Sequence, residues 1–365
     1  MIETVEKRSL TISSKLQRIR EKLAMSGLDA MLVTYLPDVR WLTSFSGSNG
    51  TVLLTPADSW FFTDFRYQEQ VKDEVTNSLP VVTAEGYVKE LKSQKYACGK
   101  RIGFQSERLS FDAVERLRAE LPDFEFVPIG GFFDDLVMVK EESELERMRK
   151  AVEISDRVFE KILPLLSPKV TELDVAAEIS YWNKKFGADK DSFDPIVASG
   201  PRGALPHARP SNQHLLPNEL VVIDMGCMYQ GYASDQTRTV GVGRVSDEAR
   251  KVYNLVLEAH LLGIESAKAG MTGTELDGIV RDFLTKKGYG QEFGHSLGHG
   301  VGLEVHEKPT VGKKGETKIP AGSVITIEPG VYLPGKFGVR IEDMVLVTAS
   351  GAVPFQKSPK HLIEV

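Results

Sequence analysis

Hydrophobic residues recur with two different periods along the chain, and these periods predict its helices and strands. From residue 13 to residue 26 they return every three or four positions, which is the spacing of one helix face. The apolar positions of this face are Leu16, Ile19, Leu23 and Met25. The pattern stops at Gly27, a residue type that can adopt the left-handed conformation that ends a helix. We therefore predict a helix over residues 13–26.

Shorter apolar runs follow and alternate between strand-like and helix-like stretches. Strands are predicted where β-branched and aromatic residues gather, over Ala30–Tyr35, Thr51–Thr55, Trp60–Thr63, Arg101–Gln105 and Phe124–Pro128. Helical spacing predicts helices over Tyr87–Ala97 and Phe111–Leu121. This alternation is typical of a self-contained α/β domain.

The character of the chain changes near residue 138. Ser143 and Glu146 have the spacing of a capping box, and a long amphipathic stretch follows them. One side of that stretch carries Leu145, Met148, Val152, Val158 and Ile162. We expect an N-terminal domain over residues 1–138 and a C-terminal domain over residues 139–365.

The C-terminal domain contains an internal repeat. The string Thr171–Asp174 recurs as Thr274–Asp277, a shift of 103 residues. Three further matches keep the same order at shifts of 99 to 104 residues: Arg149–Val152 with Arg250–Tyr253, His207–Pro210 with His306–Pro309, and Val222–Gly226 with Thr326–Gly330. Such ordered matches predict a duplicated unit of two helices, a strand, a histidine-containing loop and a strand pair.

Composition indicates a globular protein and narrows its partners. Of 365 residues, 41% are hydrophobic and 26% are charged, and no apolar run approaches the ~18–20 residues that a membrane span needs. The net charge of −6 argues against a nucleic-acid partner. Met1 to Ser14 lacks the apolar core of a secretion signal, so we do not expect secretion. Two cysteines, Cys98 and Cys227, exclude a disulfide framework and favour a reducing, cytoplasmic location.

Two aspartates lie in a predicted hairpin of the first repeat. Its strands flank a turn at Tyr229-Gln230-Gly231 and extend over Leu220–Cys227 and Tyr232–Val242. If the loop is the first two of the three turn residues, Asp224 lies directly opposite Asp235. If it is the last two, the aspartates lie diagonally on the same face, and a three-residue loop separates them. Facing carboxylates repel each other, and a cation between them is the simplest compensation.

The second repeat places two glutamates in the same way. Glu328 and Glu342 fall in predicted strands on either side of a Pro-Gly turn, over Val324–Val331 and Gly338–Val347. If both hairpins converge, the four carboxylates carry a charge of −4, which a buried site does not tolerate without partners. Two divalent cations would bring that charge to zero.

Three of the seven histidines lie within 12 residues of one another, at His295, His299 and His306. The first two are four residues apart, as in a helical zinc motif, but glycines at positions 294, 298, 300 and 302 disfavour a helix. We expect a glycine-rich loop or an irregular strand that presents the imidazoles.

The segment His295–Glu307, HSLGHGVGLEVHE, resembles the signature of the proline-directed peptidases of the pita-bread fold, a family that contains Xaa-Pro aminopeptidases and Xaa-Pro dipeptidases (prolidases). Asp224, Asp235, Glu328 and Glu342 match that family's remaining metal ligands. The resemblance covers essentially the whole chain. It implies an α/β (α+β) architecture, in which a smaller creatinase-like domain precedes a pita-bread catalytic domain built from the duplicated unit.

The resemblance also implies a role for each ligand. Asp224 chelates one metal ion, Asp235 and Glu342 bridge two ions, and His299 with Glu328 completes the second. Four carboxylates and one imidazole form an oxygen-rich set, which favours Mn²⁺, with Co²⁺ or Zn²⁺ as alternatives.

In the mechanism that the resemblance implies, a metal-bridging hydroxide attacks the carbonyl before proline, and Glu328 moves a proton to the leaving nitrogen. His207 and His306 flank the substrate and stabilise the oxyanion. Arg340 lies on the same strand face as a ligand glutamate and is expected to contact a ligand carboxylate. His295 is expected near the substrate.

We expect an Xaa-Pro aminopeptidase, which acts on peptides with proline at the second position. The alternative is an Xaa-Pro dipeptidase, which closes the far end of the cleft and captures the proline carboxylate. A metal-free binding module and a creatinase-like amidinohydrolase are further alternatives, but such relatives normally lack some of the ligands. The resemblance also implies a homodimer.

Overall fold

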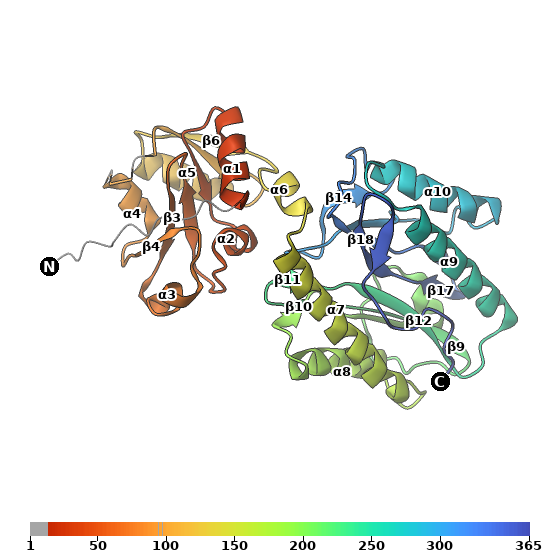
Figure 1. Ribbon diagram of the computed structural model, residues 1–365. Helices are drawn as coiled ribbons and strands as arrows, with labels where there is room; N and C mark the ends of the chain where they lie inside the picture. The colour runs from red at the N-terminus through yellow and green to blue at the C-terminus, as the bar shows by residue number, and fades with distance from the viewer. Residues whose placement is uncertain (1–13, 94, 97) are drawn as a thin grey trace. The chain divides into compact units, whose positions relative to one another are not determined.

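The computed structural model describes residues 14–93, 95–96 and 98–365, and its chain divides into two compact units, Met1–Leu136 and Val137–Val365 (Figure 1). Each unit has its own buried apolar clusters. Among the described residues, no helix is both long enough and apolar enough to cross a membrane.

A six-stranded mixed sheet forms the centre of the first unit, in the order β4-β3-β2-β1-β5-β6. Its strands are β1 (Ala30–Val33), β2 (Thr51–Leu54), β3 (Ser59–Thr63), β4 (Leu79–Val82), β5 (Arg101–Gln105) and β6 (Glu125–Ile129). The predicted strands of this unit are confirmed, with ends shifted by no more than two residues. Strand β4 was not predicted. It lies at an edge of the sheet. Pro80 is tolerated there because it has no backbone N–H to donate to a further strand.

Short helices connect the strands of the first unit. They are α1 (Ser14–Met25), α2 (Leu36–Thr43), α3 (Gln70–Glu74), α4 (Tyr87–Lys92), α5 (Phe111–Glu120) and, at the boundary between the units, α6 (Asp134–Met138), with a 3-10 turn η1 (Phe65–Tyr67). The helix predicted over Tyr87–Ala97 is therefore too long, since α4 ends at Lys92. Residues 94 and 97 lie outside the described residues.

Helix α1 confirms the first predicted helix from Ser14 onward, while residue 13 lies outside the described residues. The buried members of its apolar face are Leu16, Ile19 and Leu23. Met25 is 81% exposed, so the predicted face was wrong at its last position. It follows Leu23 by two residues and therefore lies about 200° further round the helix axis. Gly27 has a positive φ of 62°, as expected for the end of this helix.

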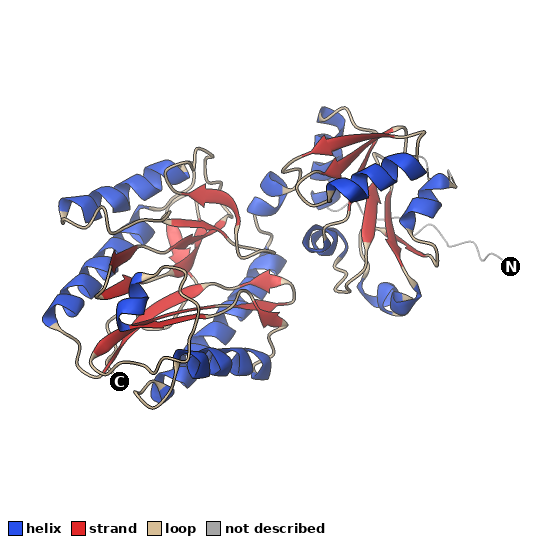
Figure 2. Cartoon of the chain, turned by 180° about the vertical axis from the view of Figure 1, so that it is seen from behind, coloured by secondary structure: helices blue, strands red, loops and turns tan. Residues whose placement is uncertain are grey.

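The second unit is built from two similar halves, with long helices on the outside and strands in the middle (Figure 2). Its helices are α7 (Glu142–Ile162), α8 (Glu172–Lys185), α9 (Asp247–Ser266) and α10 (Gly273–Lys286), with 3-10 turns η2 (Leu163–Leu165) and η3 (Gly200–Ala204). Helices α7 and α8 share one apolar cluster with strands of the first half. Helices α9 and α10 share another with strands of the second half.

The strands of each half form two small sheets. In the first half they are β7 (Lys190–Asp191), β8 (Ile196–Ser199), β9 (Glu219–Met225), β10 (Cys227–Tyr229), β11 (Tyr232–Ala233) and β12 (Gln236–Val242). In the second half they are β13 (Gly298–Gly300), β14 (Glu307–Val311), β15 (Val324–Ile327), β16 (Gly330–Leu333), β17 (Phe337–Arg340), β18 (Asp343–Val347) and β19 (Ala352–Pro354). The sheet orders are β12-β9-β8, β11-β10-β7, β14-β13-β15-β18-β19 and β16-β17.

Helix α7 confirms the predicted amphipathic stretch, but its capping box differs from the predicted one. The N-cap is Glu141, whose side chain accepts from the N–H of Glu144, while the Glu144 carboxylate accepts from the N–H of Glu141 at 2.8 Å. Ser143 already lies in the first helical turn, so the Ser143–Glu146 box was wrong. Just before the helix, the N–H of Lys140 donates to the carbonyl of Gly322 at 2.9 Å. The N-cap of the helix is the next residue, Glu141.

The duplication is confirmed at the level of whole elements, but the shift of 103 residues given by the repeated tetrapeptide does not apply to the helices. Helix α8 follows the N-cap Thr171 and α10 follows the N-cap Thr272, so Thr171 corresponds to Thr272 and not to Thr274. Capping boxes close on Asp174 and Glu275. At this shift of 101 the buried positions coincide: Glu172, Val175, Ile179 and Asn183 with Gly273, Leu276, Val280 and Leu284. The burial pattern therefore sets the correspondence.

Replacing the N-cap of α10 should test this register. The hydroxyl of Thr272 accepts from the N–H of Glu275 at 3.1 Å, so Thr272→Ala should lower the free energy of unfolding by about 0.5–2 kcal/mol. Thr272→Ser keeps the hydroxyl and should retain most of that stability. Urea denaturation of both variants checks the expectation. Equal losses in the alanine and serine variants would show that Thr272 is not the N-cap.

Candidate metal centre

The first hairpin turns at the two-residue loop Gln230-Gly231, the second of the two short loops proposed from the sequence. Tyr229 pairs with Tyr232, and the loop residues Gln230 and Gly231 both have positive φ, 46° and 81°. Two successive left-handed residues are typical of a type I′ turn, whose twist matches that of the flanking strands. The alternative in which Asp224 lies directly opposite its partner aspartate was therefore wrong.

In the observed register, Asp224 on β9 pairs with Thr237 on β12. Asp235 lies in the break between β11 and β12 rather than within a strand. Its carboxylate is thus displaced along the hairpin from that of Asp224, which leaves room between them. Asp224 and Asp235 are both buried.

The second hairpin carries its glutamates at strand ends instead of within the strands as predicted. Glu328 follows β15, and Glu342 precedes β18. The N–H of Glu328 donates to Leu297 at 2.8 Å, and the N–H of Glu342 donates to Thr237 at 3.1 Å. The two side chains therefore lie just outside the regular strands, where β15 has ended and β18 has not yet begun.

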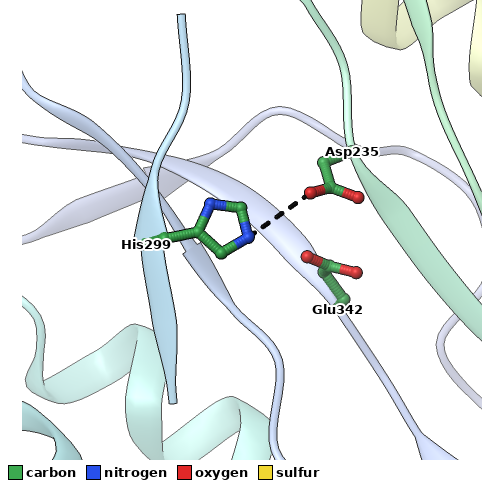
Figure 3. Close-up of side chains that lie close together, drawn as sticks. All are labelled: Asp235, His299 and Glu342. Carbon is green, nitrogen blue, oxygen red and sulfur yellow. Dashed lines mark ion pairs between the residues drawn. The ribbon is translucent and has the colours of Figure 1, made fainter. Parts of the chain in front are cut away.

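The four carboxylates and one imidazole converge on a single cavity of about 470 Å³. Asp235, His299 and Glu342 each offer a ligand atom within 4.8 Å of the others, and their side chains point toward one another (Figure 3). The Nε2 atom of His299 lies 3.5 Å from Asp235 Oδ2 and 3.4 Å from Glu328 Oε1. The cavity is lined by every site residue named from the sequence: His207, Asp224, Asp235, His295, His299, His306, Glu328, Arg340 and Glu342.

His299 is presented by an irregular strand, as expected from the surrounding glycines. Strand β13 has a register shift between His299 and Gly300. A Cβ atom on Gly298 would come within 2.1 Å of the Thr326 carbonyl oxygen, so a side chain does not fit there. The Nδ1 atom of His299 lies 3.1 Å from the Gly300 carbonyl. That hydrogen bond needs the proton on Nδ1, which leaves the Nε2 lone pair facing the carboxylates.

The remaining histidines lie around this cluster. His207 and His306 are both exposed residues of the cavity wall, and the His306 ring centre lies 4.2 Å from that of His299. His295 is held more tightly, with Nε2 at 2.8 Å from the Tyr332 hydroxyl and Nδ1 at 2.8 Å from the Ser296 carbonyl.

Arg340 contacts a ligand carboxylate as expected, and that carboxylate is Asp224. The Nη2 atom of Arg340 donates to Asp224 Oδ2 at 2.5 Å, and its Nη1 atom donates to the Tyr332 hydroxyl at 2.9 Å. Its Nε atom donates to Thr237 Oγ1, whose own hydroxyl donates to Glu342 Oε2 at 2.7 Å. The guanidinium and the threonine hydroxyl therefore hold one oxygen of each of two carboxylates.

Three neighbours of the cluster were missed in the sequence: Thr237, Thr326 and Tyr332. Thr237 could have been found from the hairpin register, because it pairs with Asp224. Thr326 accepts from the N–H of His299 at 3.0 Å and donates to Glu328 at 3.3 Å. The position of Thr326, two residues before Glu328, is only a weak indication in the sequence that it belongs to the site. Nothing in the sequence points to Tyr332.

The electrostatics of the cluster favour a bound cation. Burial raises the pKa of Glu328 to about 8, and burial together with the Glu342 charge raises the pKa of Asp235 well above its ordinary value. Burial likewise raises the pKa of Glu342 and lowers that of His299 to about 4. Oδ1 of Asp224 is buried without a hydrogen-bond partner. Carboxylate oxygens, one of them without a hydrogen-bond partner, are the donors that hard divalent cations bind, so these residues fit such ions.

Donors of this kind, gathered at a cavity of a duplicated fold, are typical of metal-dependent hydrolases. Residues 146–349 match metallopeptidase family M24, and residues 15–139 match the creatinase/prolidase N-terminal domain. The chain therefore belongs to metallopeptidase family M24 and is a metallo-exopeptidase.

Proteins named as Xaa-Pro peptidases are similar to this chain along nearly its full length. A protein named Xaa-Pro dipeptidase from Pyrococcus horikoshii is 38% identical and covers 96% of this chain and 99% of its own. A solved Xaa-Pro dipeptidase from Bacillus anthracis is 40% identical with a TM-score of 0.93, and an X-Pro aminopeptidase from Thermotoga maritima MSB8 is 36% identical with a TM-score of 0.87; each covers 96% of this chain and 99% of its own. The expected creatinase-like and pita-bread domains are confirmed.

Without metal, the free energy of unfolding should fall as the pH rises from about 6.5 to about 8. Glu328 has a folded-state pKa of about 8, and Asp235 and Glu342 are also raised, so the folded protein binds more protons than the unfolded chain in this range. The pKa values of His295 and His299, both lowered to about 4, act in the opposite sense only below their ordinary value of 6.5.

Urea denaturation in the presence of a chelator, at pH 6.5 and pH 8, measures this effect. Added Mn²⁺ should stabilise the protein more at pH 8 than at pH 6.5, because metal ligands bind in their deprotonated form. Equal stability of the chelated protein at both pH values would contradict the expectation.

Proposed function

We propose that the chain is an Xaa-Pro dipeptidase, which hydrolyses the bond between an N-terminal residue and a C-terminal proline. The convergence of the five donor side chains on one cavity carries the proposal of metal-dependent hydrolysis. The choice of dipeptidase departs from the aminopeptidase expected from the sequence. It is supported by the Xaa-Pro dipeptidase names of the relatives from Pyrococcus horikoshii and Bacillus anthracis.

An Xaa-Pro aminopeptidase is the second candidate, because the Thermotoga maritima structure carries that title at similar coverage. Both candidates act on peptides with proline at the second position, and they differ in whether the chain may continue beyond it. The metal-free binding module and the amidinohydrolase are less well supported, since all five donor positions are filled.

The proposed metal ligands are Asp224, Asp235, His299, Glu328 and Glu342, which would hold two divalent cations. The oxygen-rich donor set supports Mn²⁺, with Co²⁺ or Zn²⁺ as alternatives. When bound, such ions lower the pKa of water toward ~7 and polarise the scissile carbonyl.

The other roles follow from where the side chains lie. Glu328 lies 3.4 Å from His299 at the edge of the cluster, where its carboxylate would take up a proton and pass it to the leaving nitrogen. His207 and His306, exposed on the cavity wall, would donate hydrogen bonds to the substrate and to the oxyanion. Arg340 fixes Asp224, and His295 lies beside Tyr332 at the cavity wall.

We further propose a cytoplasmic homodimer that acts on small proline-containing peptides. Cys98 and Cys227 are both free and buried, which supports a reducing environment. The dimer rests on the family resemblance alone.

Replacing one bridging ligand should remove metal and activity together. We expect Asp235→Asn to lose bound Mn²⁺ and to lower kcat/KM by about 10³-fold or more, because the bound ions supply several kcal/mol of transition-state stabilisation. Metal analysis and hydrolysis of a proline peptide are measured on the same sample. Asp282→Asn, the same change at an exposed position of α10, is the control and should alter neither. Hydrolysis that persists without bound metal would refute the mechanism.

The two candidate activities are separated by the products from Xaa-Pro and Xaa-Pro-Yaa-Yaa in the presence of Mn²⁺. A dipeptidase should cleave the dipeptide and leave the tetrapeptide intact. Cleavage of both peptides would replace the dipeptidase by the aminopeptidase. Cleavage of neither, with no metal bound, would favour the binding module.

A further inference from the structure

The last residues of the chain, 355–365, lie against both hairpins that carry the proposed ligands, although none of the ligands comes from this segment. At one end, the N–H of Phe355 donates to Met344 on β18 at 2.9 Å. At the other end, the N–H of Val365 donates to Gly241 on β12 at 2.9 Å. The segment thus connects a strand of the second repeat with a strand of the first.

Gln356 is the member of this segment that reaches the ligand positions directly. Its side chain is buried, at 4% exposure. Its Nε2 atom donates to the backbone carbonyl of Asp235 at 2.8 Å, and its Oε1 atom accepts from the backbone N–H of Met344 at 2.8 Å. One primary amide therefore bridges the main chain at Asp235 and the main chain two residues after Glu342.

Both bridged backbone groups lie where the regular strand pairing is interrupted. Asp235 sits in the break between β11 and β12, and Met344 lies on β18 next to Val345, whose pair with Pro354 is the last between β18 and β19. A buried backbone group left without a partner costs about 1–3 kcal/mol. The Gln356 amide uses one N–H donor and its oxygen acceptor here, as a peptide group would, and so supplies hydrogen bonds to both backbone groups.

The same segment is also linked to the main chain of the other proposed bridging residue, Glu342, through Arg238, a fully buried side chain of β12. Nη1 of Arg238 donates to the carbonyl of Glu342 at 2.6 Å. Its Nη2 and Nε atoms donate to the carbonyls of Ser358 and Pro359, at 3.2 and 3.1 Å. Its charge is compensated by Asp343 at 2.7 Å. The C-terminal segment thus contacts the backbone of Asp235 directly and is linked to the backbone of Glu342 through Arg238.

We propose that Gln356 is a positioning residue of the metal centre, whose amide fixes the main chain of Asp235 relative to the strand that begins after Glu342. The inference rests on the proposed ligand roles of Asp235 and Glu342. Metal sites require ligand distances within about 0.2 Å of their preferred values. Loss of the hydrogen bonds that support a ligand typically lowers metal affinity about 10–100-fold. Gln356 sets the separation of the two carboxylates without touching a metal ion.

Metal affinity of the full chain tests this role. Gln356→Met keeps the length of the side chain and removes both hydrogen bonds, and we expect the metal-free variant to bind Mn²⁺ about 10–100-fold more weakly than the parent protein in a calorimetric titration. Ser358→Ala is the matched control, because it removes a buried polar side chain from the same segment. The Ser358 hydroxyl contacts Asp156 and Gln236, and neither is a proposed ligand. This control should lose stability but bind Mn²⁺ within about twofold of the parent.

A second variant keeps the test open if Gln356→Met does not fold. Gln356→Glu preserves the shape and the acceptor for Met344, but it places an oxygen instead of a donor against the Asp235 carbonyl, and Mn²⁺ affinity should fall here as well. With Co²⁺ bound, the visible absorption spectrum should change in both Gln356 variants and not in Ser358→Ala, since it reports ligand geometry.

Parent-like Mn²⁺ affinity in a folded Gln356 variant would overturn the proposal. So would failure of both variants to fold while Ser358→Ala folds, because Gln356 would then serve folding and not the metal site. The proposed function fails separately, if Asp235→Asn retains its metal.

Discussion

Four carboxylates share one cavity in the second unit, and their mutual repulsion is the constraint around which that unit is built. Burial raises the pKa values of Asp235, Glu328 and Glu342, so the bare site resists full ionisation. The repulsion between these buried groups makes binding of a divalent cation more favourable, because the cation would neutralise their charge. His299 faces these carboxylates across the cavity, and the donor set agrees with the match to metallopeptidase family M24.

The surrounding protein forms hydrogen bonds with some carboxylate oxygens of the cluster and leaves one buried oxygen without a partner. Arg340 takes one oxygen of Asp224, and the hydroxyl of Thr237 takes one oxygen of Glu342. The other oxygen of Asp224 is buried and unpartnered, which suits a metal ligand and would be costly in an ordinary core. Away from the carboxylates themselves, the backbone of Asp235 is bonded by Gln356 and the backbone of Glu342 by Arg238. The side-chain oxygens and the main chain of these residues are therefore supported by different groups.

Much of the fold could be predicted because its signals are local. Apolar periods located α1, α5 and α7, and runs of β-branched residues located five strands of the first sheet to within two residues. The errors arose where a contact distant in sequence decides the outcome. The capping box of α7 moved to Glu141 because Lys140 is tied to Gly322. The repeated tetrapeptide misaligned α10 by two residues, since burial against the neighbouring strands, and not residue identity, sets where that helix begins.

By itself the sequence determined which donors are available, the order of the duplicated elements and the family, because residue type, spacing and motif are properties of the chain alone. Tertiary structure decided the loop of the first hairpin, where Gln230 and Gly231 adopt left-handed conformations, and hence the offset between Asp224 and Asp235. It also decided that Arg340 pairs with Asp224, and that Gln356 spans two strands. The contacts of Arg340 with Asp224 and of Gln356 with Asp235 join residues that lie more than a hundred positions apart, and no local pattern of hydrophobic or polar residues encodes them.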